Sequence, residues 1–181
     1  HIFRPLGMVD TAFQVAPQSK DRFASVYSAN LFGGITLSEA SVDSPFLQRP
    51  RLYSGGGGLV STAMDYARFC QMLLNQGTFN GRRLLKAATV AEMIKNQLPL
   101  RAYPMGIIIP RPGIGFGLGF SVVVESVDTN LPRRIGEYGW SGMASTHFWI
   151  SPKDDLAVVV LSQLLPYTPQ LEMAIRPLIY E

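Results

Sequence analysis

The sequence has few of the residues that most often carry covalent or metal chemistry. It contains one cysteine and two histidines among 181 residues. Because Cys70 is the single thiol, no disulfide can form within the chain, and cysteine usage does not report the redox compartment. No group of histidines, cysteines or carboxylates has the spacing of a metal-binding motif. We therefore expect no metal site.

The sequence also lacks a strong excess of charge and a long apolar run. Its 16 Lys and Arg residues stand against 13 Asp and Glu residues, a formal net charge of +3. The basic clusters, such as Arg133-Arg134, are short and far apart, so nothing favours nucleic acid or an acidic membrane surface as a partner. Apolar runs such as Leu156 to Leu161 fall well below the roughly 18 residues needed to span a bilayer. We expect a soluble protein.

The N-terminal residues lack the features of a natural start. The segment from His1 to Met8 does not begin with methionine, and it has neither the basic region nor the apolar region of a signal peptide. We interpret the first residue as a cut inside a longer protein. The location of the protein then stays open, and both the cytoplasm and the periplasm are compatible with the sequence.

Hydrophobic periodicity divides the chain into four parts, which we assign to a single domain. Residues 1–54 show no sustained period and predict loops with brief helices. Residues 55–100 have helical spacing, and residues 113–165 contain β-branched and aromatic runs separated by turns, which predict antiparallel strands. Residues 169–181 predict a last amphipathic helix. Helices followed by antiparallel strands indicate an α+β fold.

Some individual elements can be placed within these parts. Thr62 can cap a helix that runs from Ala63 to about Asn75, and helical spacing returns between Lys86 and Gln97. Pro99, Pro104, Pro110 and Pro112 mark a long loop. Four extended runs follow, at Gly115–Glu125, Ile135–Gly142, Thr146–Ile150 and Leu156–Gln163. The compact connection from Ser151 to Asp155 predicts a hairpin between the last two runs.

Alternating glycines at positions 113, 115, 117 and 119 superficially resemble a nucleotide-binding loop. Such a loop needs a helix N-terminus after the glycines to hold the phosphate, whereas the residues from Ser121 to Glu125 predict a strand. We therefore interpret these glycines as positions where backbone segments approach closely inside a twisted strand.

The segment Gly139-Trp140-Ser141-Gly142-Met143 comes within one residue of the nucleophile elbow of α/β-hydrolases. That motif requires glycine where Met143 stands, and it requires a helix afterwards, whereas a strand is predicted here. His147 is the one plausible base for Ser141. We reject a self-contained catalytic pair and expect a partly exposed structural histidine. We also expect Cys70 to be a small apolar core residue.

Four segments, taken in order, resemble the family of class C β-lactamases, DD-peptidases and family VIII esterases. They are Phe3–Thr11, which contains Pro-Leu-Gly-Met, then Gly57–Phe69, Gly115–Phe120 and Phe148–Pro152. The resemblance runs nearly end to end. It implies that the chain forms the C-terminal portion of the β-lactamase and penicillin-binding-protein fold. This portion would be an antiparallel sheet packed with helices, and the fold would be incomplete.

The resemblance also implies where an active site would lie. The family uses a serine and a lysine in Ser-x-x-Lys, a tyrosine, and a Lys-Thr-Gly motif on an edge strand. No serine of this chain has a lysine three places on, so the nucleophile, its lysine and the tyrosine are expected upstream of His1. Trp140, Ser141 and Gly142 occupy the Lys-Thr-Gly position, and Met143 follows where the family takes a backbone N–H for its oxyanion hole. Gly57 and Gly58 are assigned to the substrate-binding wall.

The implied activity is acyl transfer through an acyl-serine intermediate, with a small-molecule ester or β-lactam as substrate and no cofactor. Trp140 replaces the motif lysine, as in a Trp-Gly-Gly variant familiar among the esterases. Gly57 falls where class C β-lactamases carry a tyrosine, so we prefer an ester-cleaving enzyme. The fragment itself is expected to be inactive and to self-associate. The alternative is a non-catalytic β-lactamase-like structural or binding module.

Overall fold

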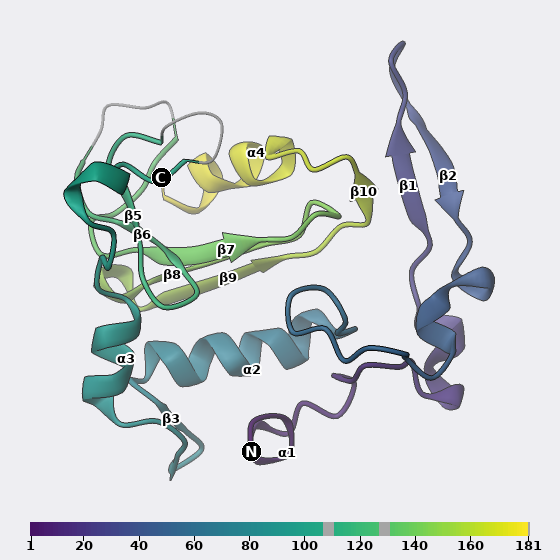
Figure 1. The fold of residues 1–181 in the computed structure, drawn as a ribbon, viewed down its shortest axis with the longest axis horizontal. Helices are drawn as coiled ribbons and strands as arrows, with labels where there is room; N and C mark the ends of the chain where they lie inside the picture. Colours follow the sequence, from purple (N-terminus) through teal and green to yellow (C-terminus); the bar gives the residue numbers. More distant parts are fainter. Residues whose placement is uncertain (107–110, 127–130, 181) are drawn as a thin grey trace.

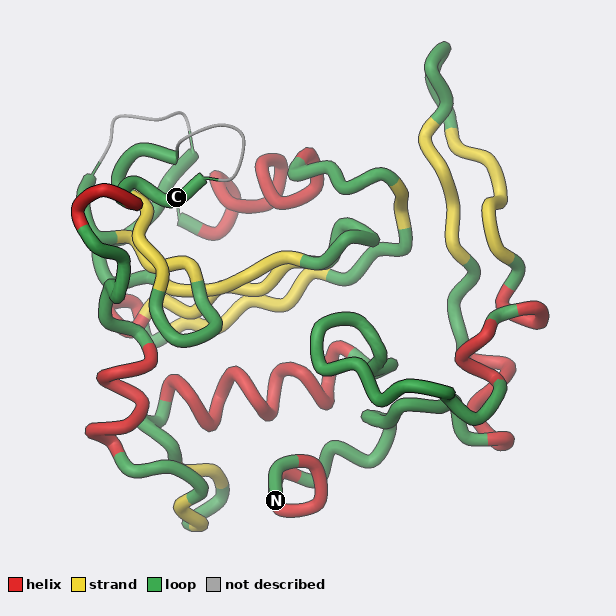
Figure 2. Tube along the Cα trace, viewed as in Figure 1, coloured by secondary structure: helices red, strands yellow, loops and turns green. Residues whose placement is uncertain are grey.

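The computed structural model describes residues 1–106, 111–126 and 131–180, and its central feature is a five-stranded antiparallel sheet (Figures 1 and 2). The strands lie in the order β5-β6-β7-β8-β9. They are β5 (Ile114–Phe116), β6 (Ser121–Val123), β7 (Tyr138–Ser141), β8 (His147–Ser151) and β9 (Leu156–Val160). Helix α2 (Ala63–Leu74) lies along one face of the sheet and α4 (Gln170–Ile179) along the other (Figure 1). The predicted α+β class is confirmed.

Helix α2 begins where the sequence predicts, because Thr62 caps it. The Thr62 hydroxyl accepts a hydrogen bond from the Asp65 N–H at 3.2 Å, which satisfies one of the free donors of the first turn. Asp65 itself is buried, and its carboxylate accepts from the Asp10 N–H at 2.8 Å and from the Thr11 hydroxyl at 3.0 Å. The N-terminal segment, which includes the short helix α1 (Phe3–Leu6), is thereby fixed to α2.

The apolar core fills the space between α2 and the sheet. Its buried members are Leu6, Met8, Cys70, Met72, Leu73, Val90, Phe120, Val122, Tyr138, Phe148 and Ile150. Cys70 is fully buried, and this burial raises the pKa of its thiol to about 12. The prediction of a small, apolar core residue at Cys70 is confirmed.

Helix α3 (Ala87–Met93) is shorter than the helical spacing predicts. It ends at Met93 because the Met93 carbonyl accepts a hydrogen bond from the Leu118 N–H at 2.8 Å, and the Asn96 side chain accepts from the Phe116 N–H at 3.1 Å. The residues after α3 therefore run beside β5. Ahead of α3, a small hairpin joins β3 (Thr78–Phe79) to β4 (Arg82–Arg83) through a turn at Asn80 and Gly81, both with positive φ.

The glycine-rich run contains two strands, whereas the sequence predicts one. Strands β5 and β6 form a hairpin, and Gly119 takes a φ of 101° in its turn. A Cβ atom on Gly117 would lie 2.0 Å from the Met93 carbonyl oxygen, so the close backbone approach predicted for these glycines is confirmed. Pro110, one of the predicted loop prolines, lies outside the described residues.

The first third of the chain contains a hairpin that sequence analysis missed. Strand β1 (Val26–Ala29) pairs antiparallel with β2 (Ile35–Glu39) and parallel with β10 (Leu164–Leu165). This hairpin projects away from the sheet (Figure 1). The remaining segments are the short 3-10 helices η1 (Pro17–Arg22), η2 (Ser41–Asp43), η3 (Pro45–Leu47), η4 (Leu100–Ala102) and η5 (Pro152–Asp154). The last of these closes the predicted β8–β9 hairpin.

Candidate active site

The candidate site lies at the end of strand β7 and in the turn that follows it. Strand β7 lies in the middle of the sheet, so the expectation of an edge strand is wrong for the strand as a whole. Its pairing with β6, however, stops at Gly139, whereas its pairing with β8 continues through Ser141. The residues from Trp140 onward therefore have an open side, and they form a local edge at the position where the sequence predicts one.

Two glycines of this segment are required by close contacts. A Cβ atom on Gly139 would lie 2.1 Å from the Phe148 carbonyl oxygen, and one on Gly142 would lie 2.4 Å from the Thr146 hydroxyl. Neither distance is compatible with a side chain, so β7 approaches β8 more closely here than a larger residue would permit.

Trp140 stands at the open side with a partly exposed ring. The side chain is 41% exposed, and its ring meets Phe116 edge to face, with 5.0 Å between centroids. Such a contact fixes the orientation of the indole while leaving part of it available to a bound molecule.

The turn after β7 presents Met143 to solvent, with 79% of the residue exposed. Among the described residues, no acceptor takes a hydrogen bond from the Met143 N–H. Its neighbours are held firmly: the Gly142 N–H donates to the Thr146 carbonyl at 2.8 Å, and buried Ser145 donates to the Leu164 carbonyl at 2.9 Å. A well-supported turn that leaves a backbone N–H without an acceptor is compatible with an oxyanion donor.

Ser145 was not identified from the sequence. Its hydroxyl also accepts a hydrogen bond from the Thr168 N–H at 3.0 Å, and Ser162 donates to the carbonyl groups of Ala144 and Ser145. The segment from Ser162 to Thr168 thus supports the turn. Ser145 has a positive φ of 61°, and no local sequence motif predicts this backbone conformation.

His147 lies opposite Ser141 on strand β8, but it is buried, with 3% of its surface exposed. The expectation of a partly exposed histidine is therefore wrong. Its Nδ1 lies 3.0 Å from a Glu172 carboxylate oxygen, and its Nε2 lies 3.3 Å from the Thr168 carbonyl oxygen. The Nδ1 atom makes no hydrogen bond despite its closeness to Glu172. Among the described residues, no hydrogen bond joins either ring nitrogen to the Ser141 hydroxyl, so the two residues do not form a catalytic pair in this structure.

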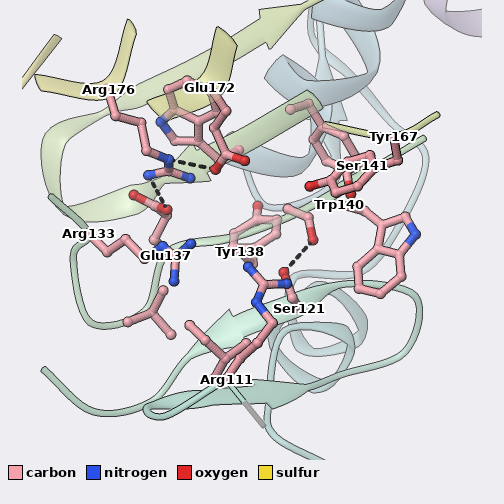
Figure 3. A pocket seen from close by; sticks show the side chains of 15 residues that line it. Arg111, Ser121, Arg133, Glu137, Tyr138, Trp140, Ser141, Tyr167, Glu172 and Arg176 are labelled. Atoms are coloured by element: carbon pink, nitrogen blue, oxygen red, sulfur yellow. Dashed lines mark hydrogen bonds and ion pairs between the residues drawn. The ribbon is translucent and has the colours of Figure 1, made fainter. Parts of the chain in front are cut away.

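A cleft of about 420 Å³ opens between strands β5 to β8 and helix α4 (Figure 3). Trp140 and Ser141 line one end of it, next to Tyr167. Five charged residues also line it, and these are Arg111, Arg133, Arg176, Glu137 and Glu172. The open end of β7 therefore borders a cleft with both an aromatic and a charged wall.

A buried ion network closes the floor of this cleft. Arg176 lies 2.7 Å from Glu137 and 2.7 Å from Glu172, and its guanidinium also stacks over Trp149 at 4.1 Å. The Tyr180 hydroxyl donates to the second Glu137 oxygen at 2.6 Å. These contacts anchor α4 to the sheet. No spacing within the sequence pairs an arginine of α4 with a glutamate 39 positions earlier, just before β7, so sequence analysis missed the network.

Gly57 and Gly58 lie in the loop before α2, at the end of the sheet where β7 finishes (Figure 1). Gly57 is exposed, and a Cβ there would have no atom within 4 Å. Gly58 is constrained, because a Cβ would lie 2.7 Å from the Ser54 carbonyl oxygen. Neither residue lines the cleft described above.

Two further classes of site receive no support from the described ranges. Within residues 1–106, 111–126 and 131–180, no three His, Cys, Asp or Glu side chains come together in a way that would hold a metal ion. In the same ranges, every helix is too short or too polar to cross a membrane.

Comparison with known proteins identifies the family. The family model for beta-lactamases matches residues 1–177. The chain belongs to the beta-lactamase family. Protein Rv1367c of Mycobacterium tuberculosis is 32% identical over 175 residues, which cover 91% of this chain and 42% of that protein. Acyltransferase calJ of Penicillium decumbens is 26% identical over 158 residues, which cover 78% and 37% of the two proteins.

A solved structure has the same fold. A LovD6 mutant of simvastatin synthase (LovD) from Aspergillus terreus superposes with a TM-score of 0.79 and 26% identity. The superposition covers 99% of this chain and 47% of that one. The fold is thus that of the serine β-lactamases and penicillin-binding proteins, and the chain spans less than half the length of each of these three relatives.

Proposed function

We propose that the protein to which this chain belongs cleaves carboxylic esters or β-lactams through an acyl-serine intermediate. The observation that carries the proposal is the open end of β7, where a partly exposed Trp140 lines a cleft. In the turn just after β7, the Met143 N–H has no acceptor among the described residues. This chain would supply the strand that lines the acyl pocket and one oxyanion donor. The nucleophilic serine, with its lysine and tyrosine, would come from another part of the protein.

The chemistry follows from that division of roles. The serine oxygen attacks the carbonyl carbon, its proton passes to the base, and the carbonyl oxygen becomes an anion beside the Met143 N–H. Collapse of this intermediate breaks the ester or amide bond and leaves the acyl-serine. Water then attacks the acyl group, releasing the acid and restoring the serine.

Two of the relatives are named as an acyltransferase and a synthase, and both names fit the same intermediate. An acyl-serine can be attacked by an alcohol or an amine in place of water, with the acyl group passing to that acceptor. We keep hydrolysis as the proposed reaction, and acceptor attack is a variation of its second step.

The preference for esters rests on Trp140. The family resemblance places a lysine at this position, and a lysine would attract the carboxylate of a β-lactam. The Trp140 indole carries no charge, and its edge-to-face contact with Phe116 offers an apolar surface. We therefore expect neutral short-chain esters to react faster than carboxylate-bearing cephalosporins.

The test compares kcat/KM for a nitrophenyl ester and for a cephalosporin in the whole protein and in Trp140 variants. Trp140→Ala should reduce ester turnover, and Trp140→Lys should shift the ratio toward the cephalosporin. Met143→Ala is the matched control and should be mild, because the backbone N–H remains. Losing that donor itself would cost about 2.7 to 4 kcal/mol of transition-state stabilisation.

Two outcomes would contradict the proposal. If both Trp140 variants leave the ratio unchanged while the protein stays folded, Trp140 does not occupy the lysine position. If the whole protein turns over neither substrate and has no Ser-x-x-Lys motif, the chain is part of a non-catalytic module.

A further inference from the structure

We infer that the cleft between β5 to β8 and α4 is a binding site for a small molecule that carries a carboxylate or phosphate group, held by Arg111 and Arg133. This inference does not depend on the proposed hydrolase activity. It rests on the charges that line the cleft and on how they are already paired.

The two acidic side chains of the cleft are fully engaged with other partners. One Glu137 oxygen contacts Arg176 at 2.7 Å, and the other accepts from the Tyr180 hydroxyl at 2.6 Å. One Glu172 oxygen contacts Arg176 at 2.7 Å, and the other lies 3.0 Å from His147. Each of the four carboxylate oxygens therefore already has a partner. Neither glutamate forms an ion pair with Arg111 or Arg133, although both carboxylates lie near enough to raise the pKa of Arg133.

Arg111 and Arg133 lack a direct ion pair in the part of the chain that the structure describes. Arg111 is exposed and Arg133 half-buried, and both guanidinium groups point toward the middle of the cleft (Figure 3). Within residues 1–106, 111–126 and 131–180, neither guanidinium has a hydrogen bond or an ion pair.

The surroundings of Arg133 disfavour the charged form of its guanidinium. Burial lowers the pKa of Arg133, and the neighbouring Arg111 and Arg176 cations lower it further; Glu172 and Glu137 act in the opposite direction, but the net pKa stays below the usual value. An anion bound between Arg111 and Arg133 would offset both effects, since it would replace lost solvation and separate like charges.

The shape of the cleft selects the kind of ligand. A guanidinium offers parallel N–H donors that match the oxygen atoms of a carboxylate or a phosphate. The cleft is open to solvent on one side, and apolar Ile114 and Val123 line it together with the arginines. A small organic anion, with its charged end at Arg111 and Arg133, fits this combination.

The experiment measures binding by isothermal titration calorimetry with inorganic phosphate, acetate and succinate as probes. Arg111→Gln and Arg133→Gln should each weaken binding of the preferred probe by about tenfold. Arg82→Gln is the matched control, because Arg82 is exposed on β4 and lies outside the cleft; it should change binding by less than about twofold. Arg133→Lys should be intermediate, since it keeps the charge and loses the paired donors.

The probes separate the two ligand chemistries. Binding of phosphate in preference to the carboxylates identifies a phosphate site, and the reverse identifies a carboxylate site. The inference is overturned if no probe binds, or if Arg82→Gln weakens binding as much as the cleft variants do. Unfolding curves of each variant show whether a loss of binding reflects a loss of structure. Ester turnover is measured separately, so a failure of the proposed hydrolase activity would leave this result intact.

Discussion

At the scale of single residues, the candidate site depends on backbone groups and on positions that lack a side chain. Met143 contributes an N–H, and Gly139 and Gly142 contribute the absence of a side chain. The family resemblance located these positions, because the pattern Trp-Ser-Gly-Met is local. It could not locate Ser145 or the burial of His147, since both follow from contacts with the distant residues Leu164, Thr168 and Glu172.

Ser145 provides a test of this support. We predict that Ser145→Ala lowers kcat of the whole protein by about ten- to a hundredfold and changes KM little, because a loosened turn displaces the Met143 N–H. The stability cost should be about 1 to 3 kcal/mol, from the unpaired Leu164 carbonyl and Thr168 N–H. Steady-state kinetics and urea unfolding measure the two effects.

Ser151 gives the control for that variant. It is also a buried serine, it lies at the opposite end of β8, and its hydroxyl donates to Asp154. Ser151→Ala should lower stability by a similar amount and leave kcat unchanged. Equal losses of kcat in both variants would mean that Ser145 acts on stability alone.

At the scale of elements, the sequence predicted the helices and strands that are specified by neighbouring residues. The Thr62 cap, the helix after Pro169 and the β8–β9 hairpin are present as predicted. The β1–β2 hairpin was missed because both strands are short, and the apolar–polar alternation in β2 covers only Ile35 to Ser38. Its apolar members, Ile35 and Leu37, are more than half exposed and face no core. Helix α3 was overestimated because its end is set by hydrogen bonds to a strand more than 20 residues away.

The junction of α3 with β5 yields an element-scale prediction. Gly117→Ala would place a Cβ 2.0 Å from the Met93 carbonyl oxygen, and the two backbone segments must separate to relieve this contact. We expect a loss of about 1 to 3 kcal/mol in the free energy of unfolding. Gly56→Ala is the control, because a Cβ there meets no atom within 4 Å, and its effect should stay within about 0.5 kcal/mol. Equal urea midpoints for the two variants would show that α3 and β5 are not packed this closely.

At the scale of the whole molecule, the chain exposes surfaces that soluble proteins usually cover. Leu31 at the tip of the β1–β2 hairpin is 98% exposed, Phe32 beside it is fully exposed, and Val42 and Leu52 are largely exposed. Strand β9 pairs with β8 on one side and, in the part of the chain that the structure describes, with no strand on the other. Open strand edges and apolar patches both promote association between molecules.

We therefore predict that the 181-residue chain, prepared alone, self-associates through these surfaces. Sedimentation velocity at micromolar concentration should show species larger than the monomer. The double variant Leu31→Ser and Phe32→Ser should reduce association, because a polar tip removes apolar surface that associating molecules would bury. Leu100→Ser is the control, since Leu100 is 94% exposed but lies outside the hairpin, and it should have little effect. A stable wild-type monomer would show that the chain tolerates its exposed hairpin and the open edge of β9. Equal association in both serine variants would instead place the contact at β9, where Val158 and other residues with strand propensity offer a second chain unpaired backbone groups.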